Sequence, residues 1–193
     1  MKIMSIIKDT FMLFIITLVL VAILAFAKET TKARIEQANR EAQMKAFNEV
    51  CPGYAESESI KDDVVGAGAG YNASLMSDNN AVIRCKNSSG DVIGYIVQCT
   101  SKGFGGALNL IVGFDTKGNI TGVRYANTPS ETPGLGMKTT EMSFLDSWLN
   151  HNADNVEEVD TISGATVSST AFKEAVKLAC MYANRAVTLD GGV

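Results

Sequence analysis

Three loops rich in small residues could bind a ligand through their main chain. They are Gly103–Gly106, Glu131–Gly136 and Asp160–Thr166, which read GFGG, ETPGLG and DTISGAT. Small residues let main-chain N–H groups approach a planar ring or a phosphate without interference from Cβ atoms. A helix is expected soon after Thr166, and a helix N-terminus favours an anion. Taken singly, each loop is more often a turn, and residues 163–166 also fit a plain N-cap region.

Catalysis by side chains alone lacks its usual groups. The single histidine, His151, lies in the polar segment HNAD and fits a solvated loop residue better than a general base. Residues 64–71, VVGAGAGY, resemble a nucleotide-binding loop but place Tyr71 where G-x-G-x-x-G requires glycine. The H-E-x-x-H, Walker A and G-x-S-x-G patterns are absent from the sequence. Any chemistry is therefore expected to come from a bound cofactor.

The four cysteines carry no metal-binding signature. They are Cys51, Cys85, Cys99 and Cys180. Their wide spacing, without a C-x-x-C pair, argues against a zinc or iron–sulfur site. They could form two disulfides in three connectivities, but isolated cysteines also serve as small apolar core residues, and we favour that interpretation.

Composition limits the partners. The chain has 193 residues, 46% of them hydrophobic, with 17 basic and 21 acidic side chains. A net charge of −4 argues against nucleic acid as a partner, because binding a phosphate backbone requires a basic surface. The length fits one ordinary domain plus an apolar segment.

Residues 11–27, FMLFIITLVLVAILAFA, form that apolar segment. Seventeen residues at about 1.5 Å each approach the roughly 30 Å bilayer core, so we expect a membrane anchor in contact with lipid. A cleaved secretory signal is the alternative, because Ala25–Ala27 resembles a cleavage site. Basic residues lie on both sides of the segment and do not decide its orientation. Both interpretations export the remainder of the chain.

The remaining residues predict a single α+β domain. Residues 28–50 have helical charge spacing and continue the anchor as a stalk, which Cys51–Gly53 ends. Four strands in two hairpins are expected at residues 81–86, 92–100, 107–114 and 120–125, followed by helices at 140–150 and 170–187. We expect an antiparallel sheet with packed helices. The predicted parts are an anchor (1–27), a helical stalk (28–52) and one domain (53–193).

In this order, on a chain that starts with an apolar helix, the three loops resemble the FMN-binding domain family of membrane redox complexes. The resemblance is to the G subunits of Rnf electron-transport complexes, with the C subunit of the sodium-pumping NADH:quinone oxidoreductase as a relative. In that family a flavin transferase esterifies FMN through its phosphate at D-x-x-[ST]-G-A-[TS]. The pattern matches Asp160, Ser163, Gly164 and Ala165 here, and Thr166 falls on the acceptor position.

The resemblance also implies that the ETPGLG loop, including Gly134 and Gly136, lies near the flavin ring. We hypothesise that Glu131 and Thr132, or their main-chain groups, hydrogen-bond the ring edge and tune the flavin potential, and that Leu135 covers one ring face. Lys138 either stabilises negative charge on the flavin or its phosphate, or is a plain solvated lysine.

The function implied by the resemblance is electron transfer inside a larger complex. That complex moves electrons between ferredoxin and NAD and couples them to Na⁺ or H⁺ transport. The chain would be a subunit of this redox-driven translocase, not catalytic alone, with an extracytoplasmic C-terminal domain. Its partners would be the other subunits, and a flavin transferase during maturation. The alternatives are a C-type subunit of the quinone reductase and a flavin-free extracytoplasmic binding or assembly module.

Overall fold

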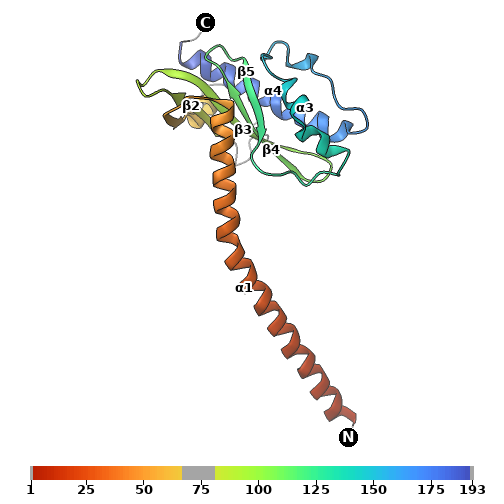
Figure 1. The fold of residues 1–193 in the computed structure, drawn as a ribbon. Coiled ribbons are helices and arrows are strands. Elements are labelled where there is room, and N and C mark those ends of the chain that lie inside the picture. Colours follow the sequence, from red (N-terminus) through yellow and green to blue (C-terminus); the bar gives the residue numbers. More distant parts are fainter. Residues whose placement is uncertain (1, 67–80, 192–193) are drawn as a thin grey trace. The chain divides into compact units, whose positions relative to one another are not determined.

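The computed structural model describes residues 2–66 and 81–191, which divide into two compact units at residues 1–41 and 42–193 (Figure 1). Residues 67–71, which hold most of the apparent nucleotide loop, lie outside the described residues.

The first unit belongs to α1 (Lys2–Val50), a single α-helix that covers both the expected anchor and the expected stalk. Large apolar side chains of this helix are exposed, for instance Phe11 at 62% and Leu18 at 56%. Within the part of the chain that the structure describes, no helix is both long and apolar enough to cross a membrane. The helix ends just before the Cys51–Gly53 turn, as predicted, and Gly53 has the positive φ of a C-terminal turn.

The second unit contains a five-stranded antiparallel sheet in the order β1-β2-β3-β4-β5. The strands are β1 (Glu56–Ser59), β2 (Ala81–Lys86), β3 (Val92–Lys102), β4 (Ala107–Phe114) and β5 (Ile120–Tyr125). Each of the four predicted strands is present, and the antiparallel arrangement is confirmed. The prediction missed the edge strand β1, whose ESES sequence is exposed along its whole length.

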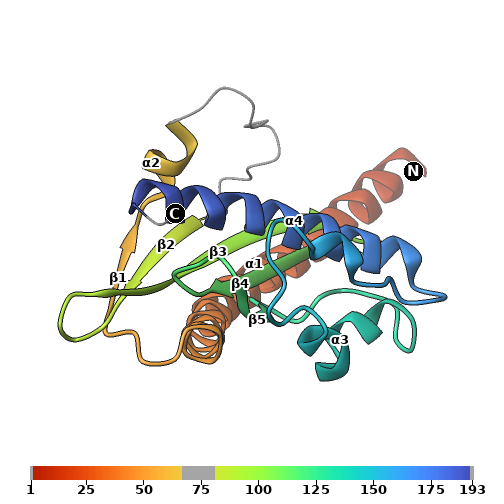
Figure 2. The same ribbon diagram turned by 90° about the horizontal axis from the view of Figure 1, so that it is seen from above.

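Both faces of the sheet are covered. Alternate residues of each strand point to opposite faces, so Tyr95 and Val97 of β3 enter one core while Ile96 enters the other. The larger core lies under α4 (Thr166–Leu189), which runs along one face of the sheet (Figure 2). The smaller core packs Ala46 and Val50, from the last turns of α1, against β2, β3 and β4. The α+β class is therefore confirmed.

The helices differ from the prediction in extent. The short helices are α2 (Lys61–Gly66), η2 (Gly136–Thr140), α3 (Met142–Asp146) and η3 (Val156–Glu158). The expected helix at residues 140–150 is wrong in length, because α3 is five residues long and turns follow it. Its aromatic residues still pack on α4, with the Phe144 and Phe172 ring centroids 5.1 Å apart. Helix α4 begins at Thr166, one turn before the predicted start at residue 170.

A half-buried ion pair joins the end of α4 to the sheet. Arg84 on β2 donates to both carboxylate oxygens of Asp190, and the Tyr95 hydroxyl donates to Asp190 Oδ2 at 2.7 Å. Burial alone would raise the pKa of the Asp190 carboxyl, but the hydrogen bonds from Arg84 and Tyr95 outweigh it and lower that pKa below its usual 3.8. The ion pair therefore stabilises the fold wherever Asp190 is ionised.

We expect Arg84→Met to reduce the free energy of unfolding by about 1–3 kcal/mol at pH 7, because it leaves Asp190 without its charged partner. A lowered carboxyl pKa gives stability that is present above the unfolded pKa and is lost as the pH falls through the folded one. The difference between the variant and the wild type should therefore shrink below about pH 4. Urea denaturation at several pH values measures this difference in the free energy of unfolding. Lys86→Met, which removes one partner of the exposed Glu58, is the control and should change stability far less than Arg84→Met. A pH-independent difference for Arg84→Met would contradict the ion-pair account.

Candidate functional site

One pocket brings the three small-residue loops together. It has a volume of about 320 Å³, which is at the small end of the range for ligand sites. It lies at the start of α4, next to the segment that carries η2. The lining residues are Phe104, Glu131, Thr132, Leu135, Gly136, Gly164, Ala165, Thr166, Val167 and Ser168. Loops separated by up to about sixty residues in the sequence therefore share one concave surface.

Glu131 holds these loops to one another. Its side chain is buried, with 6% of its surface exposed. Carboxylate Oε1 accepts a hydrogen bond from the Gly105 N–H at 3.0 Å, and Oε2 accepts one from the Ser168 hydroxyl at 2.5 Å. Charge-assisted hydrogen bonds of this length are among the strong ones in proteins. A single carboxylate thus connects the GFGG loop, the ETPGLG loop and the first turn of α4.

Glycines make room for the Glu131 carboxylate. A Cβ at Gly103 would collide with Oε1, and a Cβ at Gly136 would collide with Oε2 and approach the Ser168 Oγ to 2.9 Å. The small residues at these positions therefore let the main chain close around a buried side chain. Each oxygen of Glu131 has a protein partner, so the side chain has a positioning role in the loops, while the hypothesised bond to a ring edge stays a prediction. Thr132 is exposed at the pocket, and its carbonyl accepts from the Leu135 and Met137 N–H groups at 3.2 Å.

Thr166 is the first residue of α4 and is exposed at the pocket. The residue before it, Ala165, is the N-cap and makes no side-chain capping bond, so side-chain capping does not explain the SGAT sequence. The first N–H groups of an α-helix have no partner within the helix and attract anions. Gly164 has a φ of +80°, which a residue with a side chain rarely adopts, and it faces Leu135 across the pocket.

The hydroxyl groups that follow Thr166 either make hydrogen bonds within the protein or lie outside the pocket lining. Ser168 and Ser169 are buried, at 2% and 0% exposed. Ser168 donates to Glu131, while the Ser169 Oγ donates to the Ala165 carbonyl at 2.9 Å and accepts from the Ile162 N–H at 3.1 Å. Thr170 is exposed but lies outside the pocket lining. Among the hydroxyls of residues 163–170, Thr166 alone combines exposure with a place in that lining.

Apolar side chains form the open wall of the pocket. Phe104 is 72% exposed, Val167 59% and Leu135 48%. Exposed apolar groups gathered around a concave site are typical of a surface that a ligand or partner covers. Leu135 was expected here, whereas sequence reasoning did not select Phe104, Val167 or the role of Ser168. The signal for Phe104 was present, since a lone aromatic residue between glycines rarely serves a core.

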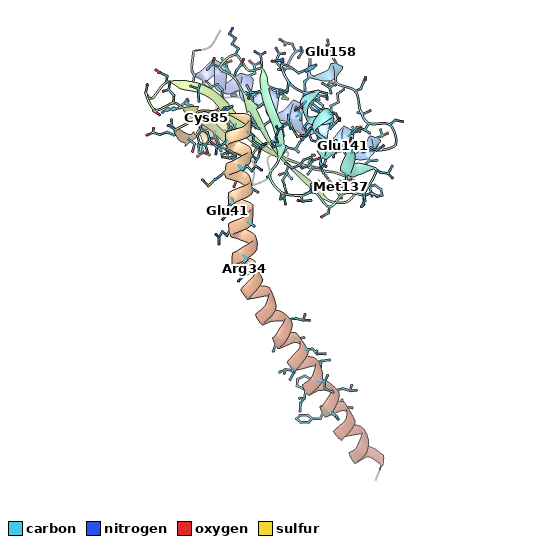
Figure 3. The ribbon with its side chains drawn as sticks, viewed as in Figure 1. Arg34, Glu41, Cys85, Met137, Glu141 and Glu158 are labelled. Carbon is cyan, nitrogen blue, oxygen red and sulfur yellow. The ribbon has the colours of Figure 1, made fainter. Side chains whose placement is uncertain are left out.

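The other candidate residues lie around the pocket and not in its lining. Gly134 has a φ of +76° in the turn that follows Pro133, and Lys138 is exposed on η2, the segment where Figure 3 labels its neighbour Met137. Asp160 and Ser163 are exposed in the loop that leads to α4. The start of this loop is fixed by α4 itself, because Lys173 Nζ donates to the Glu157 and Val159 carbonyls at 2.6 and 2.8 Å.

Comparison with known families agrees with this arrangement. The FMN-binding domain family matches residues 103–180, and a family described as the RnfG N-terminal region matches residues 1–50. The first match spans all three loops of the pocket, together with β4, β5 and most of α4. The domain that carries the pocket is therefore an FMN-binding domain.

Individual relatives define the family more closely. The chain is 31% identical over 178 residues to the G subunit of the ion-translocating oxidoreductase complex of Methanosarcina acetivorans, and the match covers 87% of this chain and 89% of the relative. It is 26% identical to the G subunit of the Na⁺-translocating ferredoxin:NAD⁺ oxidoreductase complex of Acetobacterium woodii, over 86% of each chain. The chain belongs to this family of G subunits of ion-translocating oxidoreductase complexes.

The fold also has a solved relative. The C subunit of the Na⁺-translocating NADH-quinone reductase from Parabacteroides distasonis matches with a TM-score of 0.53 and 17% identity. The match covers 79% of this chain and 93% of that one. At this identity the likeness is one of fold.

Proposed function

We propose that this chain is an electron-transfer subunit of a membrane-bound, ion-translocating ferredoxin:NAD⁺ oxidoreductase complex. We further propose that it carries FMN joined through its phosphate to Thr166. The FMN-binding domain and the G-subunit relatives support the class of protein. In this role the chain is one component of the translocase and works with the other subunits.

One observation supports the proposed attachment of FMN at Thr166. Its hydroxyl group lies at the pocket on the first turn of α4, whereas the nearby Ser168 and Ser169 are buried in hydrogen bonds with the protein. An acceptor hydroxyl must be reachable by a transferase, and Thr166 meets that requirement without any rearrangement of the core. A phosphodiester at this position has one negative charge, which a helix N-terminus stabilises.

The surrounding residues fit FMN in chemistry. Phe104, Leu135 and Val167 offer apolar contact area for an isoalloxazine ring. Glu131, with the glycines that make room for its carboxylate, fixes the loops around the pocket in place. When bound, FMN supplies the reversible electron-transfer chemistry that these side chains lack. Lys138, exposed on η2, is proposed to offset negative charge on the cofactor.

The test is fluorescence of the full chain after denaturing electrophoresis. We expect a band that fluoresces under ultraviolet light when the chain is coexpressed with a flavin transferase, and a dark band without the transferase. A dark band in both cases, with the transferase shown to be active on another substrate, would support a flavin-free binding or assembly module instead. Copurification with ferredoxin-dependent subunits, and not with quinone-reductase subunits, separates the G-type from the C-type role.

We also propose that residues 11–27 anchor the chain in the membrane and that the domain is extracytoplasmic. The support is the run of exposed apolar side chains on α1 and the family match over residues 1–50. Deletion of residues 1–27 should release the chain from membranes that have been washed with carbonate. Leu18→Arg should weaken retention, since a charge at the centre of a spanning helix costs about 2.5–3.5 kcal/mol. Fractionation followed by immunoblotting measures both effects.

Ala38→Arg, on the exposed helix beyond the apolar segment, is the matched control and should leave retention unchanged. The intact mass of the purified chain separates a retained anchor from a cleaved leader. A membrane-impermeant amine reagent should label the domain in intact cells. Full release of the wild-type chain by carbonate, or protection of the domain from that reagent, would contradict the proposed topology.

A further inference from the structure

Two cysteines that are distant in the sequence meet at the end of α1. Cys51 is the first residue after the helix, and Cys85 lies on β2, where Figure 3 labels it beside the end of α1. Both are buried, at 5% and 0% exposed, in the smaller core on the sheet face opposite α4. In this structure both are thiols.

The register of the sheet places Cys85 beside the space that the Cys51 sulfur occupies. Cys85 pairs with Gly94 across the antiparallel β2–β3 ladder, so the two residues are direct neighbours on one face. A Cβ built on Gly94 would lie 3.6 Å from the Cys51 Sγ. The sulfur of Cys51 therefore fills the space that the missing Gly94 side chain leaves beside Cys85. Each thiol is close enough to the other to shift its pKa.

This contact makes the two thiols unequal. The interaction with the Cys85 side chain lowers the pKa of Cys51, although burial opposes that shift. The same interaction, together with burial, raises the pKa of Cys85. The thiolate is the nucleophile in disulfide exchange, so Cys51 is the residue of the pair that reacts first. Cys51 also adjoins the exposed Pro52–Gly53 turn, the side from which a small oxidant would reach it.

We propose that Cys51 and Cys85 form a disulfide that fastens the end of α1 to the sheet, made by exchange with a small or protein disulfide. The Cys51 thiolate attacks the oxidant, forms a mixed disulfide and releases one thiol. Cys85 then loses its proton, attacks the Cys51 sulfur and releases the second thiol. Two protein thiols are oxidised to one disulfide, and the oxidant disulfide is reduced to two thiols.

The other two cysteines provide an internal comparison. Cys99 and Cys180 lie in the larger core between β3 and α4, where burial raises the pKa of each to about 12. Neither has a lowered pKa or lies next to an exposed turn, as Cys51 does. We expect both to remain thiols under conditions that oxidise Cys51 and Cys85.

The test is peptide mapping of the full chain in detergent after incubation with oxidised glutathione. The sample is denatured in acid, alkylated without reduction and digested. The expected result is a Cys51–Cys85 linked peptide that is lighter by two hydrogen atoms than the sum of its thiol parts, with Cys99 and Cys180 alkylated. Alkylated Cys51 and Cys85, or a link that joins either one to another cysteine, would overturn the proposal.

A second readout keeps the test independent of peptide recovery. Closing the loop from residue 51 to residue 85 should raise the melting temperature of the oxidised chain by roughly 5–10 °C relative to the reduced chain. The Cys51→Ala/Cys85→Ala double variant should melt at one temperature regardless of reductant. A reductant-dependent shift that persists in this variant would contradict the assignment. Flavin fluorescence of the same samples reports on the proposed function separately.

Discussion

Thr166→Ala should abolish the covalent flavin while leaving the fold intact. The substitution removes a hydroxyl that is exposed at the pocket, so no core contact is lost and the change in stability should stay within about 0.5 kcal/mol. Without the acceptor, in-gel fluorescence should fall to background after coexpression with the transferase. Circular dichroism and thermal melting of the same preparation check the fold.

Two hydroxyl variants sharpen this result. Thr166→Ser retains an acceptor at the same position and should keep most of the fluorescence. Thr170→Ala removes an exposed hydroxyl from the next turn of the same helix and should keep all of it. Undiminished fluorescence in Thr166→Ala, or its loss in Thr170→Ala, would show that another residue holds the flavin.

Glu131→Ala should damage the site by removing the side chain that connects its three loops. The variant leaves the buried Ser168 hydroxyl and the partly buried Gly105 N–H without their acceptor. The loss of this acceptor should cost about 2 kcal/mol in unfolding free energy, or roughly 4–8 °C in melting temperature. The three loops would no longer be held together, so flavin loading should fall by roughly tenfold or more, an effect worth about 1.4 kcal/mol at the pocket. Quantitative in-gel fluorescence and urea denaturation measure the two effects.

Glu131→Gln separates charge from shape. The amide can still accept from Gly105 and meet Ser168, but with neutral hydrogen bonds that are about half as strong. Its stability and flavin loading should therefore lie between those of the wild type and Glu131→Ala. Glu141→Gln, which neutralises an exposed carboxylate at the start of α3, is the matched control and should behave as wild type. A Glu131→Ala chain that loads flavin normally would rule out the positioning role.

The sheet was largely predictable because its signals are local. Residues 81–86, 92–100, 107–114 and 120–125 are rich in β-branched residues and separated by turn sequences, and the strands follow in that order. Strand β1 was not predictable, since ESES is polar and exposed and forms a strand only through its pairing with β2. The start of α4 was missed for a related reason. The sequence TVSST has low helix propensity, but Ser168 gains a tertiary hydrogen bond to Glu131 and Ser169 bonds back to the Ala165 carbonyl, and both hold the first turns of the helix.

The candidate site likewise has parts that the local sequence predicts and parts that depend on long-range packing. The three loops could be found from their composition and from their order along the chain. The link between Glu131 and Ser168 joins residues 37 positions apart, and no local pattern encodes such a contact. The wall formed by Phe104 and Val167 likewise arises where the GFGG loop meets the first turn of α4. The sequence therefore identifies the pieces of the pocket, while long-range packing decides which side chains hold it together.

The position of the flavin on the chain is the central claim, and peptide mapping tests it most directly. The full chain, coexpressed with a flavin transferase, is digested, and the yellow peptide is fragmented in a mass spectrometer. The account predicts that the mass of FMN, less one water, is carried by Thr166 alone. The same mass on Ser163, Ser168, Ser169 or Thr170, or its absence from every peptide of residues 160–173, would contradict it.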